Sequence, residues 1–249
     1  MITVAGREMR VSDFSTGFRG SSVEKEIINT LISSGRQYSY DSAEQLEFEL
    51  KLRREIVVSS YDLNKSGLRF EVFRKTFCNP FYWNRTQDGG FSLKSNVRPS
   101  DAILDIYRNG QKYGTECATA MMAVYYKALL NVYSEKLFNK VFPRIELMNW
   151  HRIDRLLKDV GYMQRRDDYL PGDRRYFSNP DVNPLTPEWQ GENVIDLGGG
   201  LYYGHGIGIR RADSIIAELN QNRSRNADEY ARLVDSAGRP DFKRLALAR

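Results

Sequence analysis

The sequence has few of the residues that several classes of site require. It has two cysteines, Cys78 and Cys117, without a CxxC spacing, and two histidines, His151 and His205. A disulfide framework, a four-cysteine zinc site and a three-histidine metal site are therefore excluded. No apolar run reaches the roughly 18 residues of a membrane span. The first ten residues are partly charged and lack the apolar core of a secretory signal, so we expect no signal peptide and no membrane association.

A large excess of one charge is also missing. The chain has 37 basic and 32 acidic residues and a net charge of +5. Basic pairs such as Arg165-Arg166 and Arg174-Arg175 are separated by acidic residues, and no basic stripe or recognition helix is apparent. We therefore expect no nucleic-acid partner. The composition, 41% apolar and 28% charged, is that of a globular protein.

Helical patterns dominate the first half of the chain. A capping-box spacing from Ser21 to Glu24 opens a helix that ends at Gly35, after an irregular N-terminal arm. A second helix is predicted from about residue 41 to residue 64, and a short one from 99 to 109. Residues 117–133 are apolar on nearly all sides, with Lys127 as the only charge. A helix of this kind is buried on every side, so we expect it at the centre of the fold.

The second half favours strands and loops. Residues 161–190 are rich in Asp, Pro, Arg and Tyr and are predicted to be surface loops. Residues 193–197 and 201–203 flank three glycines and are predicted to form two strands of a hairpin. Helices are predicted near 212–220 and 226–235. No repeat or linker divides the chain, so we expect one α+β domain over residues 1–249.

Cys117 is the first candidate for chemistry, because it opens the buried helix. The positive end of a helix dipole lowers the pKa of a thiol and favours the nucleophilic thiolate. A free cysteine is more often a small buried apolar residue, and position alone leaves that alternative open. Cys78 has no comparable setting.

Glu192 and His205 form the second candidate. A two-residue turn at Gly198-Gly199 would place them opposite each other on the hairpin, whereas a three-residue loop would shift the register by one. A carboxylate and an imidazole near a thiol can serve it as acid and base. The same glycine run is also similar to the nucleotide loop of a methyltransferase, but a strand-like segment follows where that fold needs a helix.

Three segments carry a resemblance to a known family. They are residues 113–120 (YGTECATA), 189–195 (WQGENVI) and 203–209 (YGHGIGI). Shorter segments agree, among them 48–53 (FELKLR) and 176–180 (YFSNP). In order and spacing they resemble the spore-coat transglutaminases of spore-forming bacteria, which are protein-glutamine γ-glutamyltransferases. The resemblance runs from about residue 38 to about residue 220, and residues 1–35 match poorly.

The resemblance implies a compact cysteine-protease-like fold of the papain or NlpC/P60 type, in which the buried helix packs on an antiparallel sheet. It implies a calcium-independent acyl transfer, without cofactor or metal, that joins glutamine to lysine through a thioester on Cys117 and releases ammonia. Glu192 then corresponds to the partner of the cysteine, Glu116 to a second carboxylate, and His205 to a supporting active-site histidine. The substrate channel would have aromatic walls, formed by Phe70, Trp150 and Trp189.

The resemblance also implies the setting. The partners would be glutamine- and lysine-bearing spore-coat proteins, and the protein would be a monomer made in the mother-cell cytoplasm and located in the spore coat. Two alternatives stay open: a thiol hydrolase or deamidase on the same fold, and a structural coat protein without activity. A glutamate is a poor base for a thiol unless burial raises its pKa. Aromatic walls would supply that burial and would protect the thioester from water.

Overall fold

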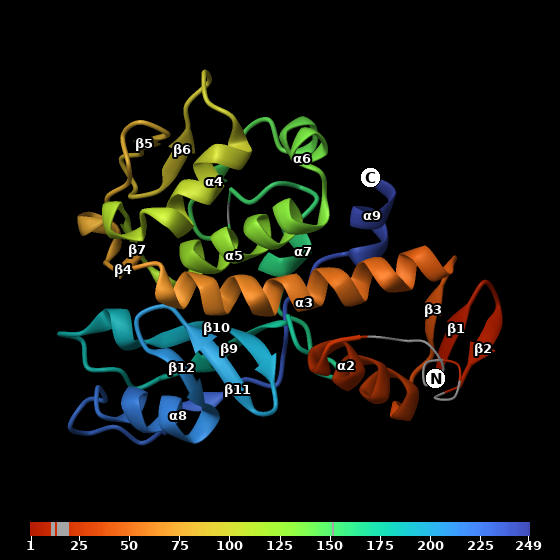
Figure 1. The fold of residues 1–249 in the computed structure, drawn as a ribbon. Helices are drawn as coiled ribbons and strands as arrows, with labels where there is room; N and C mark the ends of the chain where they lie inside the picture. Colours follow the sequence, from red (N-terminus) through yellow and green to blue (C-terminus); the bar gives the residue numbers. More distant parts are fainter. Residues whose placement is uncertain (11–12, 14–19, 151) are drawn as a thin grey trace.

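A long helix, α3, crosses the middle of the molecule and separates two layers (Figure 1). The computed structural model describes residues 1–10, 13, 20–150 and 152–249. Helices α4 to α7 lie on one side of α3, and the largest sheet lies on the other with α8 on its outer face. The helices are α2 (Ser22–Ser33), α3 (Ala43–Lys65), α4 (Pro99–Arg108), α5 (Cys117–Val132), α6 (Glu135–Val141), α7 (Lys158–Gly161), α8 (Ala212–Asn220) and α9 (Phe242–Leu247).

Helix α5 is the buried centre that its composition predicts. It packs against α3, α4, α6 and β10, and side chains on all its faces are buried, including Met121, Val124 and Leu129. These side chains belong to the main apolar cluster, which also contains Ile56 from α3 and Ile195 from the sheet. A helix enclosed in this way holds its first residue, Cys117, at a fixed place.

The largest sheet has five antiparallel strands in the order β12-β11-β10-β9-β13. The central strand β10 is buried along nearly its whole length. Ile195 joins the main apolar cluster beside α5, whereas Val194 joins a second cluster with Ile215 of α8. The strands are β9 (Arg174–Ser178), β10 (Gly191–Gly198), β11 (Leu201–Gly204), β12 (Gly208–Arg211) and β13 (Arg232–Leu233).

The predicted hairpin is confirmed, but its two-residue turn lies at Gly199-Gly200 rather than at Gly198-Gly199. Val194 pairs with Gly204 and Asp196 with Tyr202, and the register shifts between Asp196 and Gly198. All three glycines at the tip have positive φ, with Gly199 at 59°, a conformation that other residues rarely adopt. The later turn and the irregularity between Asp196 and Gly198 change the register, which if continued would put Asn193, not Glu192, across from His205.

Four further predictions of local structure differ from the fold. The N-terminal arm contains two strands, β1 (Ile2–Val4) and β2 (Arg7–Met9), and β1 pairs with both β2 and β3 (Tyr38–Tyr40). Residues 161–190 contain strand β9 rather than loops alone, and residues 226–235 contain β13 rather than a helix. Helix α9 was not predicted, and it packs along α3. In these segments, contacts with residues distant in sequence override the local pattern.

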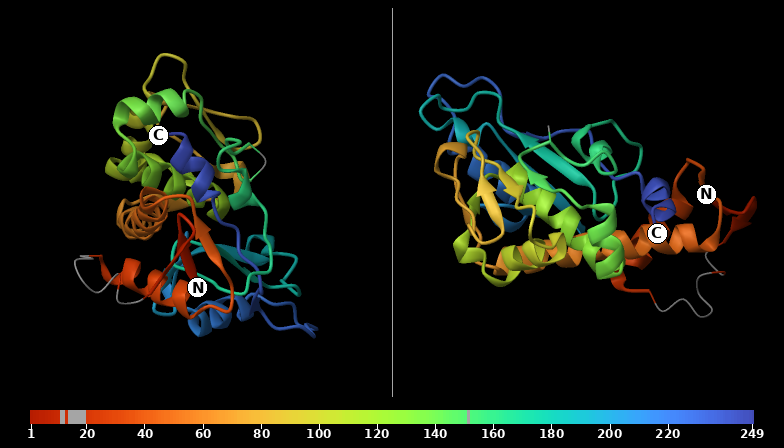
Figure 2. Two further views of the ribbon diagram at one scale, coloured as in Figure 1. Left: turned by 90° about the vertical axis from the view of Figure 1, so that its right-hand side faces the viewer. Right: turned by 90° about the horizontal axis from the view of Figure 1, so that it is seen from above.

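Two small sheets complete the fold. They contain β4 (Arg69–Phe70) with β7 (Gly114–Thr115), and β5 (Trp83–Arg85) with β6 (Phe91–Leu93) and β8 (Glu146–Leu147). The two chain termini lie at the same end of the molecule, the N-terminus in the N-terminal sheet and the C-terminus after α9 (Figure 2). The α+β class is confirmed. Among the described residues, no helix has the length and apolar character needed to cross a membrane.

Candidate active site

A cavity of about 720 Å³ opens at the start of α5. Its walls come from the segment after β4, from Asn149 and Trp150, and from the chain that leads into β10. Cys117 lines this cavity and is half-buried. Glu116, Tyr176 and Asn193 line it as well. The structure thus places the candidate cysteine where a substrate side chain can reach it.

Glu116 is the N-cap of α5, which the sequence did not predict. Its two carboxylate oxygens accept hydrogen bonds from the backbone N–H groups of Ala118, at 2.5 Å, and Thr119, at 2.8 Å. Burial raises the pKa of Glu116, although these hydrogen bonds oppose the shift. The cap satisfies two of the N–H groups that a helix leaves unpaired at its start, and so fixes the Cys117 backbone.

The expected lowering of the Cys117 pKa is wrong. Burial raises the pKa of this thiol well above its ordinary value, and the charges of Glu192 and Glu116 raise it further. Hydrogen bonds from Asn193 oppose the shift but do not reverse it. The position at the helix start is therefore outweighed by desolvation and by two neighbouring carboxylates. Such a thiol becomes a nucleophile when a base removes its proton.

Glu192 is the carboxylate suited to that task. Its side chain is 6% exposed, and its Oε1 has no hydrogen-bond partner among the residues that the structure describes. Burial and the charge of Glu116 raise the pKa of Glu192 well above that of an ordinary glutamate. The backbone N–H of His205 donates to its carboxylate and partly opposes this shift. A raised pKa makes a carboxylate a stronger base, and the unpaired oxygen can accept a proton.

His205 is close to Glu192 through its backbone rather than through its ring. Its Nε2 lies 3.1 Å from the carbonyl oxygen of Arg69, and burial lowers the pKa of the imidazole to about 4, against hydrogen bonds to the Arg69 and Thr115 carbonyls. The ring lines a separate cavity of about 380 Å³, and the Phe70 side chain borders both cavities. The expected acid–base pair of Glu192 and the His205 imidazole is thus not what the structure contains. The second imidazole, His151, lies outside the described residues.

The aromatic walls differ in part from the expectation. Phe70 and Trp150 line the cavity, but Trp189 is not among its lining residues and packs against the apolar cluster beneath α8. Tyr176, which the sequence analysis did not single out, lines the cavity instead. A Cβ atom at Gly191 would lie 2.2 Å from the Tyr176 hydroxyl, so this ring requires a glycine beside it.

Two further polar residues of the site were not predicted. The Asn193 amide donates to the Cys117 sulfur at 3.5 Å, and Arg174 donates to the Asn193 amide oxygen at 2.7 Å. Both residues lie in strands buried by the layers above and below, where the sequence gives no local sign of function. No group of three or more His, Cys, Asp or Glu suited to a metal ion occurs in the described part of the chain. A thiol that lines a cavity and interacts with a buried carboxylate, Glu192, which is not among the lining residues, is an arrangement suited to acyl transfer.

Comparisons with known proteins agree with this chemistry. The protein-glutamine gamma-glutamyltransferase of Bacillus mycoides (strain KBAB4) is 43% identical over 244 residues, which cover 98% of this chain and 87% of that protein. The enzyme of the same description from Bacillus cereus (strain G9842) is 43% identical over 243 residues, or 96% of this chain and 86% of that protein. A solved transglutaminase from Geobacillus stearothermophilus, without its C-terminal extension, has a TM-score of 0.78 at 47% identity and covers 83% of this chain and 97% of its own.

The family model described as protein-glutamine gamma-glutamyltransferase matches residues 1–249, a range that contains the whole cavity at the start of α5. The matched range therefore covers the whole chain, including the candidate site residues. The chain belongs to the protein-glutamine gamma-glutamyltransferases and is an acyltransferase of that family.

Proposed function

We propose that Cys117 is the nucleophile of this acyl transfer and that Glu192 is its general base and acid. The observation that carries the proposal is the pairing of a cavity-lining thiol with a buried carboxylate whose Oε1 has no other hydrogen-bond partner among the described residues. Their mutual electrostatic effect on pKa supports the same pairing. Glu116 contributes charge and fixes the helix start, and His205 supports Glu192 through its backbone N–H.

In the first half of the reaction, the Glu192 carboxylate takes the proton of the Cys117 thiol. The sulfur then forms a bond to the carbon of a glutamine side-chain amide. Glu192 returns the proton to the amide nitrogen, the carbon–nitrogen bond breaks, and ammonia leaves. A thioester remains on Cys117, and the backbone N–H at the start of α5 is a donor for the oxyanion that precedes it.

In the second half, the neutral ε-amine of a lysine attacks the thioester carbon. Glu192 accepts the proton that this amine loses, the carbon–sulfur bond breaks, and the proton passes to the sulfur. The product is an ε-(γ-glutamyl)lysine isopeptide bond. Phe70 and Trp150 are the proposed walls for the substrate chains, since apolar walls limit hydrolysis of the thioester by water.

The proposal extends to the fold and the setting. We place α5 and the antiparallel sheet in the cysteine-protease-like class of papain and NlpC/P60 proteins, as one domain over residues 1–249, because the helix opened by the nucleophile packs on β10. The reaction is proposed to need no calcium. The protein acts as a monomer on glutamine- and lysine-bearing spore-coat proteins, with sporulation and the spore coat as its setting and without nucleic acid or membrane.

The test is incorporation of a fluorescent primary amine into a glutamine-bearing protein, with a metal chelator present. The wild type should label the protein, and Cys117→Ala should not. Cys78→Ala is the matched control, because Cys78 is the other cysteine of the chain, also half-buried, and lies outside the cavity. Glu192→Gln should lose most of the activity, because it cannot accept the thiol proton.

Four results would contradict the proposal in different ways. Label that persists in Cys117→Ala would remove the nucleophile assignment. Cysteine-dependent release of ammonia without amine incorporation would indicate a deamidase. A folded wild type without label or ammonia release would favour a structural role, and loss of label only when chelator is added would overturn calcium independence.

A further inference from the structure

Two polar residues touch the active site without a role in the mechanism described above. Asn193 and Arg174 lie opposite the Cys117 sulfur on the central strands β10 and β9, and their exposed fractions are 8% and 4%. Burying an amide and a guanidinium beside a thiol costs free energy unless their hydrogen bonds are made. The contacts of these two residues therefore indicate what they do.

The orientation of the Asn193 amide is fixed by chemistry. A guanidinium can only donate hydrogen bonds, so the group that faces Arg174 Nη1 at 2.7 Å must be the amide oxygen. The amide nitrogen must then face Cys117, where it lies 3.5 Å from the sulfur. A second donor, the backbone N–H of Asn193, also acts on the sulfur and lowers the pKa of the thiol. One residue thus directs two N–H groups at the nucleophile.

Arg174 is itself held from three sides. Its Nε donates to the Val160 carbonyl at 2.8 Å, its Nη2 donates to the Gly161 carbonyl at 3.2 Å, and its guanidinium lies 4.1 Å from the centre of the Trp150 ring. None of the ion pairs among the described residues includes Arg174. Its polar contacts are with neutral oxygens, so its charge is not neutralised by a bonded carboxylate.

The charges around the sulfur show why such donors matter. Glu192 and Glu116 act on Cys117 with negative charge, and Tyr176 adds a hydroxyl near both Cys117 and Glu192. The thiolate that remains when Glu192 takes the proton is repelled by the negative charge of Glu116. The Asn193 donors and the Arg174 charge are the groups near the sulfur that favour the anion.

We propose that Asn193 is a catalytic residue that donates hydrogen bonds to the Cys117 thiolate, and that Arg174 is a positioning residue that keeps the Asn193 amide turned toward the sulfur. This inference rests on Cys117 being the nucleophile. It assigns to the middle of the sheet a positive charge and fixed hydrogen-bond donors at the thiolate, which the ionised Glu116 cannot supply.

Asn193→Asp is the sharpest variant, since it keeps an acceptor for Arg174 and replaces the donor to sulfur with a carboxylate. The first measurement is the rate at which iodoacetamide alkylates Cys117 at a fixed pH below the titration of the thiol, followed on the Cys117 peptide because Cys78 can also react. We expect a rate about tenfold or more below that of the wild type, since a hydrogen bond to a charged group shifts a pKa by about one unit. The kcat for amine incorporation should fall about 100-fold, with a smaller change in KM.

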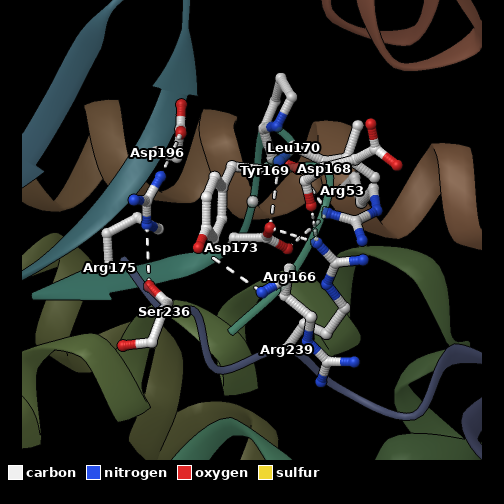
Figure 3. A network of polar contacts seen from close by, with 12 residues as sticks. Arg53, Arg166, Asp168, Tyr169, Leu170, Asp173, Arg175, Asp196, Ser236 and Arg239 are labelled. Carbon is white, nitrogen blue, oxygen red and sulfur yellow. Dashed lines mark hydrogen bonds and ion pairs between the residues drawn. The ribbon is translucent and has the colours of Figure 1, made fainter. Parts of the chain in front are cut away.

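Arg174 is tested by a pair of variants and a neighbouring control. Arg174→Met should lower both alkylation and kcat, and Arg174→Lys should restore part of both, because a lysine ammonium donates to the Asn193 oxygen but does not replace the guanidinium over Trp150. Arg175→Met is the matched control. Arg175 is also 4% exposed and also donates to two carbonyls, those of Ser236 and Val234, while lying against the Tyr169 ring (Figure 3).

The results separate this inference from the function on which it rests. Wild-type alkylation and turnover in Asn193→Asp would overturn it, as would equal losses in Arg175→Met and Arg174→Met. If Asn193→Asp does not fold, the difference between Arg174→Lys and Arg174→Met still decides the matter. Activity that survives in Cys117→Ala would instead overturn the proposed nucleophile, whatever the Asn193 variants do.

Discussion

Two buried carboxylates at opposite ends of β9 are held in contrasting ways. Asp173 directly precedes β9 and is completely buried. Its oxygens accept hydrogen bonds from Arg53 at 2.9 Å and Arg239 at 2.6 Å (Figure 3). Burial alone would raise the pKa of Asp173, but the charges of Arg239 and Arg53 outweigh it and leave the pKa below that of an ordinary aspartate.

Glu192 pairs with Phe177 near the other end of β9 and is almost as deeply buried. Its neighbour in charge is Glu116, and its pKa is raised. Arg174, a buried cation of the same sheet, does not pair with Glu192 and donates to Asn193 and to the Val160 carbonyl. Burial therefore has opposite consequences at the two ends. At Asp173 two guanidinium groups outweigh the effect of burial and favour the ionised carboxylate, whereas at Glu192 burial leaves a carboxyl group with a raised pKa.

The largest effect on stability is expected from Asp173→Asn. This change leaves the buried Arg53 without one of its two carboxylate partners, the other being Glu49, and removes the ion pair of Arg239. Breaking a buried ion pair on one side costs about 3–5 kcal/mol of unfolding free energy, because a charge remains uncompensated. Denaturant unfolding at neutral pH measures this loss.

Asp235→Asn is the control for that measurement. Asp235 also pairs with an arginine, Arg165, but the two side chains are 63% and 85% exposed. An exposed pair contributes less than about 1 kcal/mol, so the control should unfold almost as the wild type does. Equal losses in the two variants would contradict the claim that the Asp173 network stabilises the fold through buried charge.

A smaller effect on the free energy of unfolding is expected from His205→Gln. His205 is a buried base, so burial shifts its pKa in the opposite direction to that of Glu192. Its folded pKa of about 4 lies below the ordinary 6.5, so the unfolded chain binds the proton first. The stability from the neutral imidazole is fully present above pH 6.5 and is lost as pH falls toward 4, by up to about 3 kcal/mol. Unfolding curves of His205→Gln should therefore lose less stability than the wild type over this interval. Parallel losses in the two proteins would show that the imidazole is not the group responsible.

Much of the fold was predictable from local pattern. The all-round apolar composition of residues 117–132 identified the central helix, and the glycines before Leu201 identified the hairpin. The register was not predictable, because Gly198, Gly199 and Gly200 permit several turns and the observed one uses positive φ at all three. Strand β9 was missed for another reason. The partners of Asp173 and Arg175 come from segments far away in the chain, so their charges indicated surface loops.

In the candidate active site, too, some residues were predictable from the sequence and others were not. Cys117 was predicted from its place at the start of the helix, and the structure puts it in the cavity. The family resemblance, rather than the hairpin register, was the sound basis for singling out Glu192. Asn193 and Arg174 were missed because a buried asparagine or arginine has no characteristic spacing. Their importance comes from contacts across 76 residues to Cys117 and across 19 residues between the two.

The smallest effect on stability, and the sharpest contrast, is expected from Glu192→Gln. Because the folded pKa of Glu192 is raised, the folded chain binds its proton more tightly than the unfolded chain, whose carboxyl titrates near about 4.3. The resulting stability is complete below that pH and is lost as pH rises through the folded pKa. Relative to the wild type, Glu192→Gln should therefore become more stable as pH rises.

Asp173→Asn should have the opposite slope, because a lowered carboxyl pKa adds stability above the unfolded value and loses it on acidification. Urea unfolding of both variants and the wild type from about pH 3 to about pH 8 gives the two slopes in one experiment, that of Asp173→Asn below about pH 4 and that of Glu192→Gln above it. Slopes of the same sign would contradict the contrast between the two carboxylates. Opposite slopes, with activity lost in Glu192→Gln, would mean that the fold gives up stability at Glu192 and keeps there a base for Cys117.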